Sequence, residues 1–546
     1  MRTQTLFGAL AAILLMDSAG MAAEWQWSVP VPPPPASTNE TPRAFLWIPP
    51  KCERVRGVVF GHHNMEEIGI FEHPDFRKTL AELGFAEVWV APTFDRNFRF
   101  DQGAGEKFDA MMSALAEQSG YAELTNAPLV PCGHSAAASL PWYVAAWKPE
   151  RVIAGVSFSG QWPYVPDPGN APEFPAHAID TVPGIVAQGE YEWVDETIVR
   201  GLKIRNEHPL MPLSALGCPA DGHFAAQDDK IELLALYVKK AAQFRLPKNY
   251  SGGAVKLNPI DATKTGWLAE RYATDKNPSA PAAPVGEFKG NRTNAFWYFD
   301  GELARTVEKF QQGHRGKPAL LGYVQDSLVV TQRNGTHQQV TLKFLPETDG
   351  VTFKLSGAFL DTVPEGRPER WTKKKAGEHI EPPQTKIPIE IQRICGPVEK
   401  VSADTWRVAF DRASFLNDRR GNEAWFAAVW PGHSDFKRAV QQALLPIPRR
   451  LDQGRPQTID FPKLPDQNQG AKPVKLKATS DSGLPVGFFV REGPAEIAGD
   501  TLSFTPIPPR AKFPVKVTVG AWQFGRTVEP KLESAEPVER TFYITK

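Results

Sequence analysis

A serine within a run of small residues is the first candidate for chemistry in this chain. Ser135 stands in the stretch Gly-His-Ser-Ala-Ala at 133–137, between the apolar run 127–132 and a helix-like stretch. This pattern places a serine on a sharp turn from a strand to a helix, where its hydroxyl is exposed as a nucleophile. Such a turn imposes unusual backbone angles and requires small neighbours such as Gly133. Ala137 departs from the glycine that usually ends the motif.

The groups that a serine nucleophile requires follow later in the chain. A free hydroxyl is a weak nucleophile and needs a base within hydrogen-bond reach, a role for which imidazole is suited. His223 comes shortly after the apolar run 210–216 and before the amphipathic stretch 228–244. Between the serine and this histidine, runs 151–158 and 183–189 predict two further buried strands, and an acidic segment follows the second. The sequence therefore predicts a catalytic triad in the order serine, acid, histidine.

This order of strands and side chains resembles the α/β-hydrolase superfamily over residues 44–245. The resemblance implies an α/β fold with a doubly wound, mostly parallel sheet. It also implies a carboxylate that holds the histidine in the required tautomer. In superfamily members the acid often lies three residues after the glycine that closes its strand, which here gives Glu192. Glu190 and Asp195 are the alternative acids.

The same resemblance implies an oxyanion hole. The backbone amide of Ala136, directly after the serine, supplies one donor. The second donor comes from the loop 61–67, which follows the predicted strand 55–60 and resembles the His-Gly loop of lipases and esterases. A second histidine replaces the glycine pair, so the donating amide is that of His63 or Asn64. The Asn64 side chain is a further candidate.

The histidines and glutamates of this loop also raise a metal hypothesis. His62, His63, Glu66 and Glu67 carry suitable ligand atoms. However, adjacent residues on an extended loop diverge, and the sequence offers no further histidine or cysteine cluster to complete a coordination sphere. We therefore predict no metal and no other cofactor. His134, inside the serine motif, is interpreted as a packing residue that supports the site.

Length and composition define the class of protein. A chain of 546 residues exceeds one ordinary core, which predicts two or three domains. Residues 1–23 have the charged start, short apolar run and small residues of a signal peptide, which predicts a secreted or periplasmic bacterial protein. That run is shorter than the ~20 residues of a membrane span, and we expect no other span. Basic and acidic side chains balance at 62 each, so we predict no nucleic-acid partner.

Four cysteines could pair in an oxidising compartment. Cys132 and Cys218 would end strands that lie three steps apart, or about 14 Å, beyond the ~7 Å reach of a disulfide. Cys52 lies in a proline-rich turn, and Cys395 belongs to a different predicted domain. Free, buried thiols are therefore expected.

Composition divides the chain into further segments. Residues 24–43 form a proline-rich N-terminal segment, 44–250 the catalytic domain, and 251–287 a linker rich in glycine and proline. From 288 to 448, short alternating strands separated by turn signals predict a β-sandwich-like domain.

The last segment, 456–546, resembles the immunoglobulin-like repeats of bacterial secreted and surface proteins. The resemblance rests on the Ser-Gly-Leu-Pro-Val turn at 482–486, the turn at Gly493-Pro494, and Gln523 with Gly525 after a strand. Modules of this kind space or dock other domains, and they rarely catalyse.

Together these features predict a secreted serine hydrolase that cleaves carboxylic esters. Export and the β-rich half favour a polysaccharide-derived substrate, which would be an acetyl, methyl or aromatic acyl ester. Two alternatives are a peptidase or general lipolytic esterase on the same triad, and an inactive hydrolase-fold protein that binds or scaffolds. Four aromatic residues near the expected cleft are candidates for stacking on sugar rings, the alternative being that they pack the core: Trp162, Tyr164, Tyr191 and Trp193.

Overall fold

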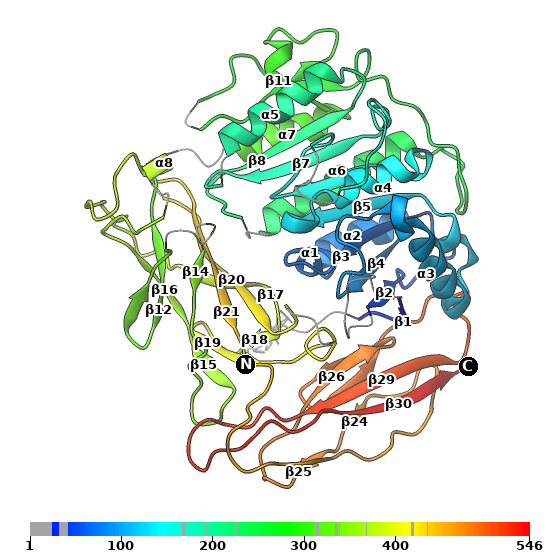
Figure 1. The fold of residues 1–546 in the computed structure, drawn as a ribbon, viewed down its shortest axis with the longest axis vertical. Coiled ribbons are helices and arrows are strands. Elements are labelled where there is room, and N and C mark those ends of the chain that lie inside the picture. Colours follow the sequence, from blue (N-terminus) through cyan, green and yellow to red (C-terminus); the bar gives the residue numbers. More distant parts are fainter. Residues whose placement is uncertain are drawn as a thin grey trace, which may run out of the picture.

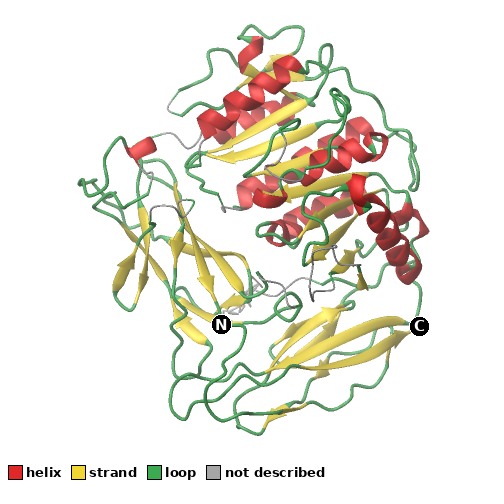
Figure 2. Ribbon diagram, in the orientation of Figure 1, coloured by secondary structure: helices red, strands yellow, loops and turns green. Residues whose placement is uncertain are grey.

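The chain forms three parts, which we name the hydrolase domain (24–312), the middle domain (316–447) and the C-terminal domain (455–546) (Figure 1). Helices gather in the first part, whereas the other two consist almost entirely of strands and loops (Figure 2). The predicted signal peptide lies outside the described residues. The computed structural model describes residues 24–31, 42–165, 171–192, 194–223, 227–274, 276–312, 316–333, 337, 339–366, 369–416, 420–433 and 435–546.

An eight-stranded sheet forms the centre of the hydrolase domain, in the order β1-β2-β4-β3-β5-β6-β7-β8. Strands β1 and β2 run antiparallel to their neighbours, and β3 to β8 are parallel. The parallel strands are buried throughout, because helices cover such sheets, and this explains their continuous apolar sequences. The predicted α/β-hydrolase fold is confirmed. The strands are β1 Trp27–Pro30, β2 Arg43–Trp47, β3 Gly57–His62, β4 Phe85–Ala91, β5 Leu129–His134, β6 Gly155–Phe158, β7 Gly184–Gly189 and β8 Leu213–Cys218.

Helices connect the parallel strands and bring their carboxyl ends to one edge. Helix α2 illustrates the local signals: the His73 side chain caps its start, Pro74 occupies its first turn, and Gly84 ends it in the left-handed region at φ 68°. Helices α2 and α6 pack side by side. The helices are α1 Glu67–Phe71, α2 Pro74–Leu83, α3 Ala104–Ser119, α4 Leu140–Trp147, α5 Val194–Glu207, α6 Asp228–Arg245, α7 Gly301–Gln312 and α8 Glu369–Thr372.

The hydrolase domain extends further along the chain than we predicted. Strands β9 Trp267–Glu270, β10 Ala283–Pro284 and β11 Ala295–Tyr298 form a small sheet, and β11 and α7 pack against β8. The Ser214 hydroxyl donates to the Trp297 carbonyl (2.5 Å), and the Tyr298 hydroxyl donates to the Ala215 carbonyl (2.7 Å). The linker predicted at 251–287 and the domain start at 288 are thereby corrected. A short apolar strand looks the same in sequence whichever domain it packs against.

The N-terminal segment also differs from the prediction. Instead of standing apart from the catalytic domain, its described part contributes β1 to the central sheet, and Trp25 and Trp27 are buried. Trp25 forms a bridge with Gly493, and the Ser28 hydroxyl donates to Glu492 of the C-terminal domain (2.7 Å). The first strand of the sheet therefore joins the hydrolase domain to the end of the chain.

The middle domain consists of small, mostly antiparallel sheets, consistent with a β-sandwich. Its core includes three residues of the C-terminal domain: Phe489, Trp522 and Phe524. Its sheets have the orders β13-β12-β16, β14-β21-β20-β17 and β15-β19-β18. The strands are β12 Leu321–Gln325, β13 Leu328–Val330, β14 Val340–Thr341, β15 Thr352–Lys354, β16 Ser356–Phe359, β17 Glu390–Cys395, β18 Val398–Lys400, β19 Thr405–Val408, β20 Glu423–Trp430 and β21 Ala439–Pro446.

The C-terminal domain is built in the same way, and it lies beside β1 and β2 (Figure 1). Its sheets have the orders β22-β25, β23-β30-β29-β26 and β24-β28-β27. Its likeness to immunoglobulin-like repeats stays a prediction. The strands are β22 Ile459–Asp460, β23 Gln467–Asn468, β24 Val474–Lys475, β25 Thr479–Ser480, β26 Gly487–Glu492, β27 Ala495–Ala498, β28 Thr501–Phe504, β29 Val515–Trp522 and β30 Val538–Thr545.

Candidate active site

The turn after β5 presents Ser135 with an unusual backbone. Its φ is 51°, in the left-handed region that residues with a side chain rarely occupy. A Cβ on Gly133 would overlap the carbonyl oxygen of Ala137, so glycine is required there. Gly160, beyond β6, makes room for Ala138 in the same way. These glycines thus let the chain turn tightly around a strained serine.

Three side chains from the loops after β5, β7 and β8 meet at the carboxyl edge of the sheet. His223 Nε2 lies 2.6 Å from Ser135 Oγ, and His223 Nδ1 donates to Glu192 Oε2. His223 and Glu192 are only 6% and 3% exposed, whereas Ser135 is partly exposed. A carboxylate can only accept, so the proton is on Nδ1 and the Nε2 lone pair faces the hydroxyl. This arrangement can activate the serine as a nucleophile.

Glu192 also accepts a hydrogen bond from a second histidine, which belongs to the middle domain. His337 Nδ1 donates to Glu192 Oε1 at 2.9 Å, so both carboxylate oxygens are hydrogen-bonded. Burial by itself raises the pKa of a carboxyl group, but the hydrogen bonds from His223 and His337 outweigh it and hold the pKa of Glu192 below its ordinary value. Glu192 is therefore charged at neutral pH.

The alternative acids have other positions. Both oxygens of Glu190 are occupied, one by the Ala220 amide (2.6 Å) and the other by Lys437 Nζ (2.6 Å). Glu190 thus fastens the loop that leads to His223, and Glu192 rather than Glu190 contacts the histidine ring. Asp195 lies within α5, and its side chain is outside the described part of the structure.

The oxyanion prediction is corrected at one residue. The His63 amide donates to the Val90 carbonyl (2.7 Å), so it is unavailable to a substrate. The Asn64 side chain donates to the His134 carbonyl (2.7 Å) and ties the loop after β3 to the serine turn. Ala136 lies in the first turn of a short 3₁₀ helix, where amides lack an intrahelical acceptor. The amides of Ala136 and Asn64 are thus the candidate donors that this structure favours.

His134, directly before the serine, holds the loop of His223 in place. Its Nε2 lies 2.9 Å from the His223 carbonyl, and its amide donates to Glu67 Oε1 (2.8 Å). Burial lowers the pKa of His134 well below its ordinary range, so the ring is neutral. Because a carbonyl only accepts, Nε2 carries the proton. His134 therefore acts as a donor that fixes the loop of His223.

The four residues of the metal hypothesis are committed to separate contacts. His62 Nδ1 lies 2.8 Å from the Thr93 hydroxyl, and burial lowers the pKa of His62 to about 3. Glu67 accepts the amides of Met65 and His134, and Glu66 pairs with Lys230 at 3.6 Å. His63 packs edge-on against Trp89.

Within the described residues, two other groups bring at least three metal-ligand side chains together. One is Glu192, His223 and His337. The other is Asp180, which lies 2.8 Å from both His177 Nδ1 and His208 Nδ1. In each group the carboxylate accepts hydrogen bonds from both histidines.

Two of the four aromatic residues named as candidates for sugar stacking are packed in the protein, Trp162 and Tyr191. Trp162 is 1% exposed, because its ring lies over Gly201 and stacks on Phe296. The Tyr164 hydroxyl donates to Asp180 (2.5 Å) and its ring stacks on His208. Tyr191 is covered by Trp371 of the middle domain at 4.2 Å between ring centroids, and Trp193 lies outside the described residues. Packing, the alternative interpretation, accounts for Trp162 and Tyr191.

The middle domain also holds the loop of His223. Arg438 Nη1 lies 2.6 Å from Asp229 Oδ2, and its Nη2 lies 3.7 Å from Asp221 Oδ1. The Gln442 side chain lies against Gly222 so closely that a Cβ there would be 2.7 Å from its oxygen. Sequence reasoning missed these contacts, because the residues belong to no motif.

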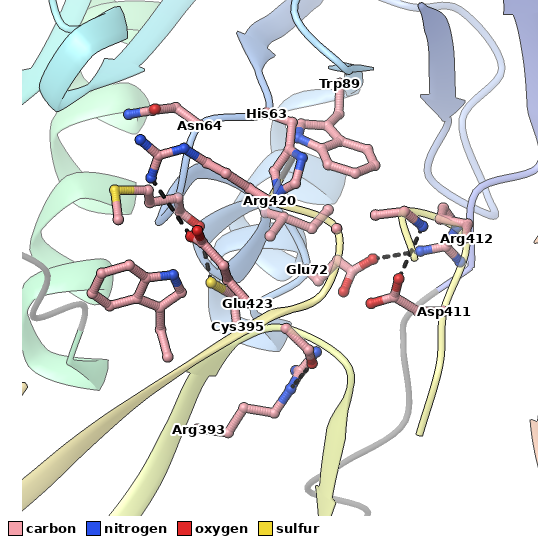
Figure 3. Close-up of a pocket in the computed structure, with 16 residues that line it drawn as sticks. His63, Asn64, Glu72, Trp89, Arg393, Cys395, Asp411, Arg412, Arg420 and Glu423 are labelled. Carbon is pink, nitrogen blue, oxygen red and sulfur yellow. Dashed lines mark hydrogen bonds and ion pairs between the residues drawn. The ribbon is translucent and has the colours of Figure 1, made fainter. Parts of the chain in front are cut away.

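A small cavity marks where the middle domain meets the loop after β3 (Figure 3). Its volume is about 20 Å³, room for about one water molecule. Arg420 of the middle domain extends toward Asn64 (Figure 3). Its Nη1 atom lies 3.8 Å from Oε2 of its ion-pair partner, Glu423. Deeper in the wall, Arg412 pairs with Glu72 at 2.7 Å. The candidate oxyanion loop is therefore packed against a second domain.

Comparison with known proteins gives likeness in structure alone. No protein-family model and no curated protein matches this sequence. Among solved structures, FphF, a fluorophosphonate-binding serine hydrolase of Staphylococcus aureus, shares 10% identity over 40% of this chain and 99% of its own, with a TM-score of 0.29. Est1E from Butyrivibrio proteoclasticus shares 17% over 39% and 96% (TM-score 0.26). LpqC, a poly(3-hydroxybutyrate) depolymerase from Bordetella parapertussis, shares 12% over 42% and 92% (TM-score 0.29). Such low values do not define what this chain acts on.

Two further predictions concern the whole chain. In the part of the chain that the structure describes, no helix combines the length and apolar character needed to cross a membrane. The four cysteines, all of them described, are buried and free.

Proposed function

We propose that this protein is a serine hydrolase that cleaves carboxylic esters. The observation that carries the proposal is the continuous contact from Ser135 Oγ through the His223 ring to the buried carboxylate of Glu192. These groups come from three different loops, after β5, β7 and β8, so their contact is not a local feature of the chain. A hydroxyl, a base and an orienting acid in this order are the groups that acyl transfer needs.

The geometry supports a two-stage reaction. His223 Nε2 takes the proton of Ser135 as Oγ attacks the ester carbonyl, and Glu192 stabilises the imidazolium that forms. The amides of Ala136 and Asn64 donate to the oxyanion of the tetrahedral intermediate. His223 returns the proton to the departing alcohol, and a water molecule, activated by the same base, then hydrolyses the acyl-enzyme.

Esters derived from polysaccharides are the substrate class that we propose first. This choice rests on the predicted signal peptide and on the two β domains, and the buried Trp162 and Tyr191 do not contribute to it. Peptides and long-chain lipid esters are the competing substrates on the same triad. A panel of acetylated and methyl-esterified glycans, long-chain esters and peptides, with kcat/KM as the readout, separates these classes.

The decisive experiment asks whether Ser135 is a nucleophile. We expect the protein to hydrolyse p-nitrophenyl acetate and to react with a fluorophosphonate probe. Ser135→Ala should lower hydrolysis by about 10³-fold or more and abolish labelling. Ser113→Ala, at an exposed serine on α3, is the matched control and should change neither. If the unaltered protein neither labels nor hydrolyses any ester of the panel, the inactive binding or scaffold protein becomes the better interpretation.

A further inference from the structure

We propose that the middle domain completes the catalytic centre, with His337 as a positioning residue that fixes Glu192 and, through it, His223. The inference rests on the proposed hydrolase function and deepens it, because it places part of the working site outside the hydrolase domain. It also implies that activity depends on how the two domains are joined.

The first observation is the contact with the triad. His337 Nδ1 and His223 Nδ1 bind different oxygens of the same carboxylate, at 2.9 Å for His337. The two imidazole rings also stack, with centroids 4.8 Å apart and planes 22° apart. A carboxylate held through both oxygens cannot turn, and a stacked ring limits the tilt of His223. Partners of this kind set the orientation of the groups that react.

The second observation is that His337 is itself held. Its carbonyl accepts a hydrogen bond from Gln442 Nε2 (2.8 Å), and Gln442 is buried on β21. The same Gln442 side chain packs against Gly222, the residue before His223. His337 has a φ of 48°, an unfavourable angle that persists only where the surroundings impose it. The imidazole thus reaches Glu192 from a braced position.

The third observation concerns the whole acid loop. Three consecutive residues each contact a different segment of the middle domain. Glu190 pairs with Lys437 at 2.6 Å, both side chains being buried, and Tyr191 stacks on Trp371 at 4.2 Å. Glu192 binds His337. An ion pair, an aromatic stack and a hydrogen bond on successive residues leave the acid loop little freedom of its own. Its conformation is therefore set jointly by the two domains.

The contact has a chemical consequence as well as a geometric one. A second donor on Glu192 withdraws negative charge from the oxygen that His223 uses, and so weakens support for the imidazolium. Without His337, the protonated base is held more strongly, and the acid limb of the kcat/KM profile moves to higher pH. The titratable and charged groups packed around this contact are Glu192 and Glu190 after β7, Asp221 and His223 after β8, His134 at the end of β5, and Lys437 and Arg438 before β21.

The test uses the full chain and three variants. His337→Ala should lower kcat for p-nitrophenyl acetate by about ten-fold or more, with little change in KM, and move the acid limb upward. His337→Asn keeps an N–H donor at the position of Nδ1 and should recover much of kcat. His379→Ala removes an exposed histidine of the same domain and should match the unaltered protein. Melting temperatures of all variants show whether each one is folded.

Two outcomes would overturn the inference while leaving the proposed function intact. The first is a His337→Ala variant whose kcat stays within two-fold of that of the unaltered, active protein and whose acid limb does not move. The second is a loss of kcat that His337→Asn does not repair and that leaves the pH profile in place, since that describes a merely structural contact. Failure of the proposed function looks different: the unaltered protein is then inert toward esters and toward the fluorophosphonate probe.

Discussion

Two surfaces meet at Glu192, and they were built in different ways. On the hydrolase side, Ser135, Glu192 and His223 each follow a buried parallel strand, and the sheet alone brings them to one edge. On the middle-domain side, His337 and Trp371 lie in separate segments that share no pattern. The comparison teaches that a triad can be positioned by local topology while its acid is held by long-range docking.

The two sides also differ in how they are stabilised. The hydrolase sheet is one large apolar core, whereas the interface combines small apolar clusters, such as that of Tyr191 and Trp371, with buried charged pairs. Two such pairs are Lys437 with Glu190 and Arg412 with Glu72. Buried charges are tolerated only when they are paired, so either surface without the other would carry charged groups that lack their partners. The middle domain is therefore part of one folded unit with the hydrolase domain, rather than a module that merely spaces.

The largest effect is expected at the acid. Glu192→Gln keeps the shape but presents an amide, which favours the wrong tautomer of His223, and we expect kcat to fall by about 10³- to 10⁴-fold. Glu190→Gln is the matched control: it should lower the melting temperature and leave kcat of the folded protein within about three-fold. Steady-state kinetics of both variants test this. A collapse of kcat in Glu190→Gln, with Glu192→Gln active, would reverse the assignment.

The next effect concerns the interface itself. Lys437→Met leaves Glu190 buried without its partner, which should lower the free energy of unfolding by about 3–5 kcal/mol. Denaturant unfolding measures this, and the double variant with Glu190→Gln should recover part of the loss. Lys317→Met, which removes an exposed ion pair with Asp435, should change little. Equal losses of unfolding free energy for the two lysine substitutions would mean that the buried pair stabilises the protein no more than the exposed pair.

The smallest effect is a pH dependence of the free energy of unfolding that arises from a histidine of the hydrolase domain and not from one of the middle domain. Burial lowers the pKa of His62 to about 3, against 6.5 in the unfolded chain. The unfolded state therefore binds one more proton between these values, so stability is complete above pH 6.5 and falls on acidification by about 1.4 kcal/mol per pH unit. His62→Gln should flatten that slope in denaturant melts, and His379→Ala should not. An unchanged slope in His62→Gln would place the acid sensitivity elsewhere.

Sequence reasoning reached most of the first region. The succession of buried strands along the chain follows from continuous apolar runs, and Ser135 from a motif whose small residues the turn requires. The amide of His63 was misjudged because the strand pairing of β3 with β4 continues one residue further than its apolar pattern shows. For Trp162, stacking on a sugar and packing in the core both stayed open, because a buried aromatic ring and an exposed one have the same sequence signature.

The sequence alone determined the order in which a serine, an acid and a histidine follow buried strands, and parallel strands all deliver their carboxyl ends to one edge. Only the tertiary structure decided that Glu192 rather than Glu190 touches His223, and that His337 touches the same carboxylate. The physical reason is the distance along the sequence between the residues that interact. A turn or a strand is dictated by neighbours a few residues away, whereas a contact across 145 residues depends on how two finished surfaces fit.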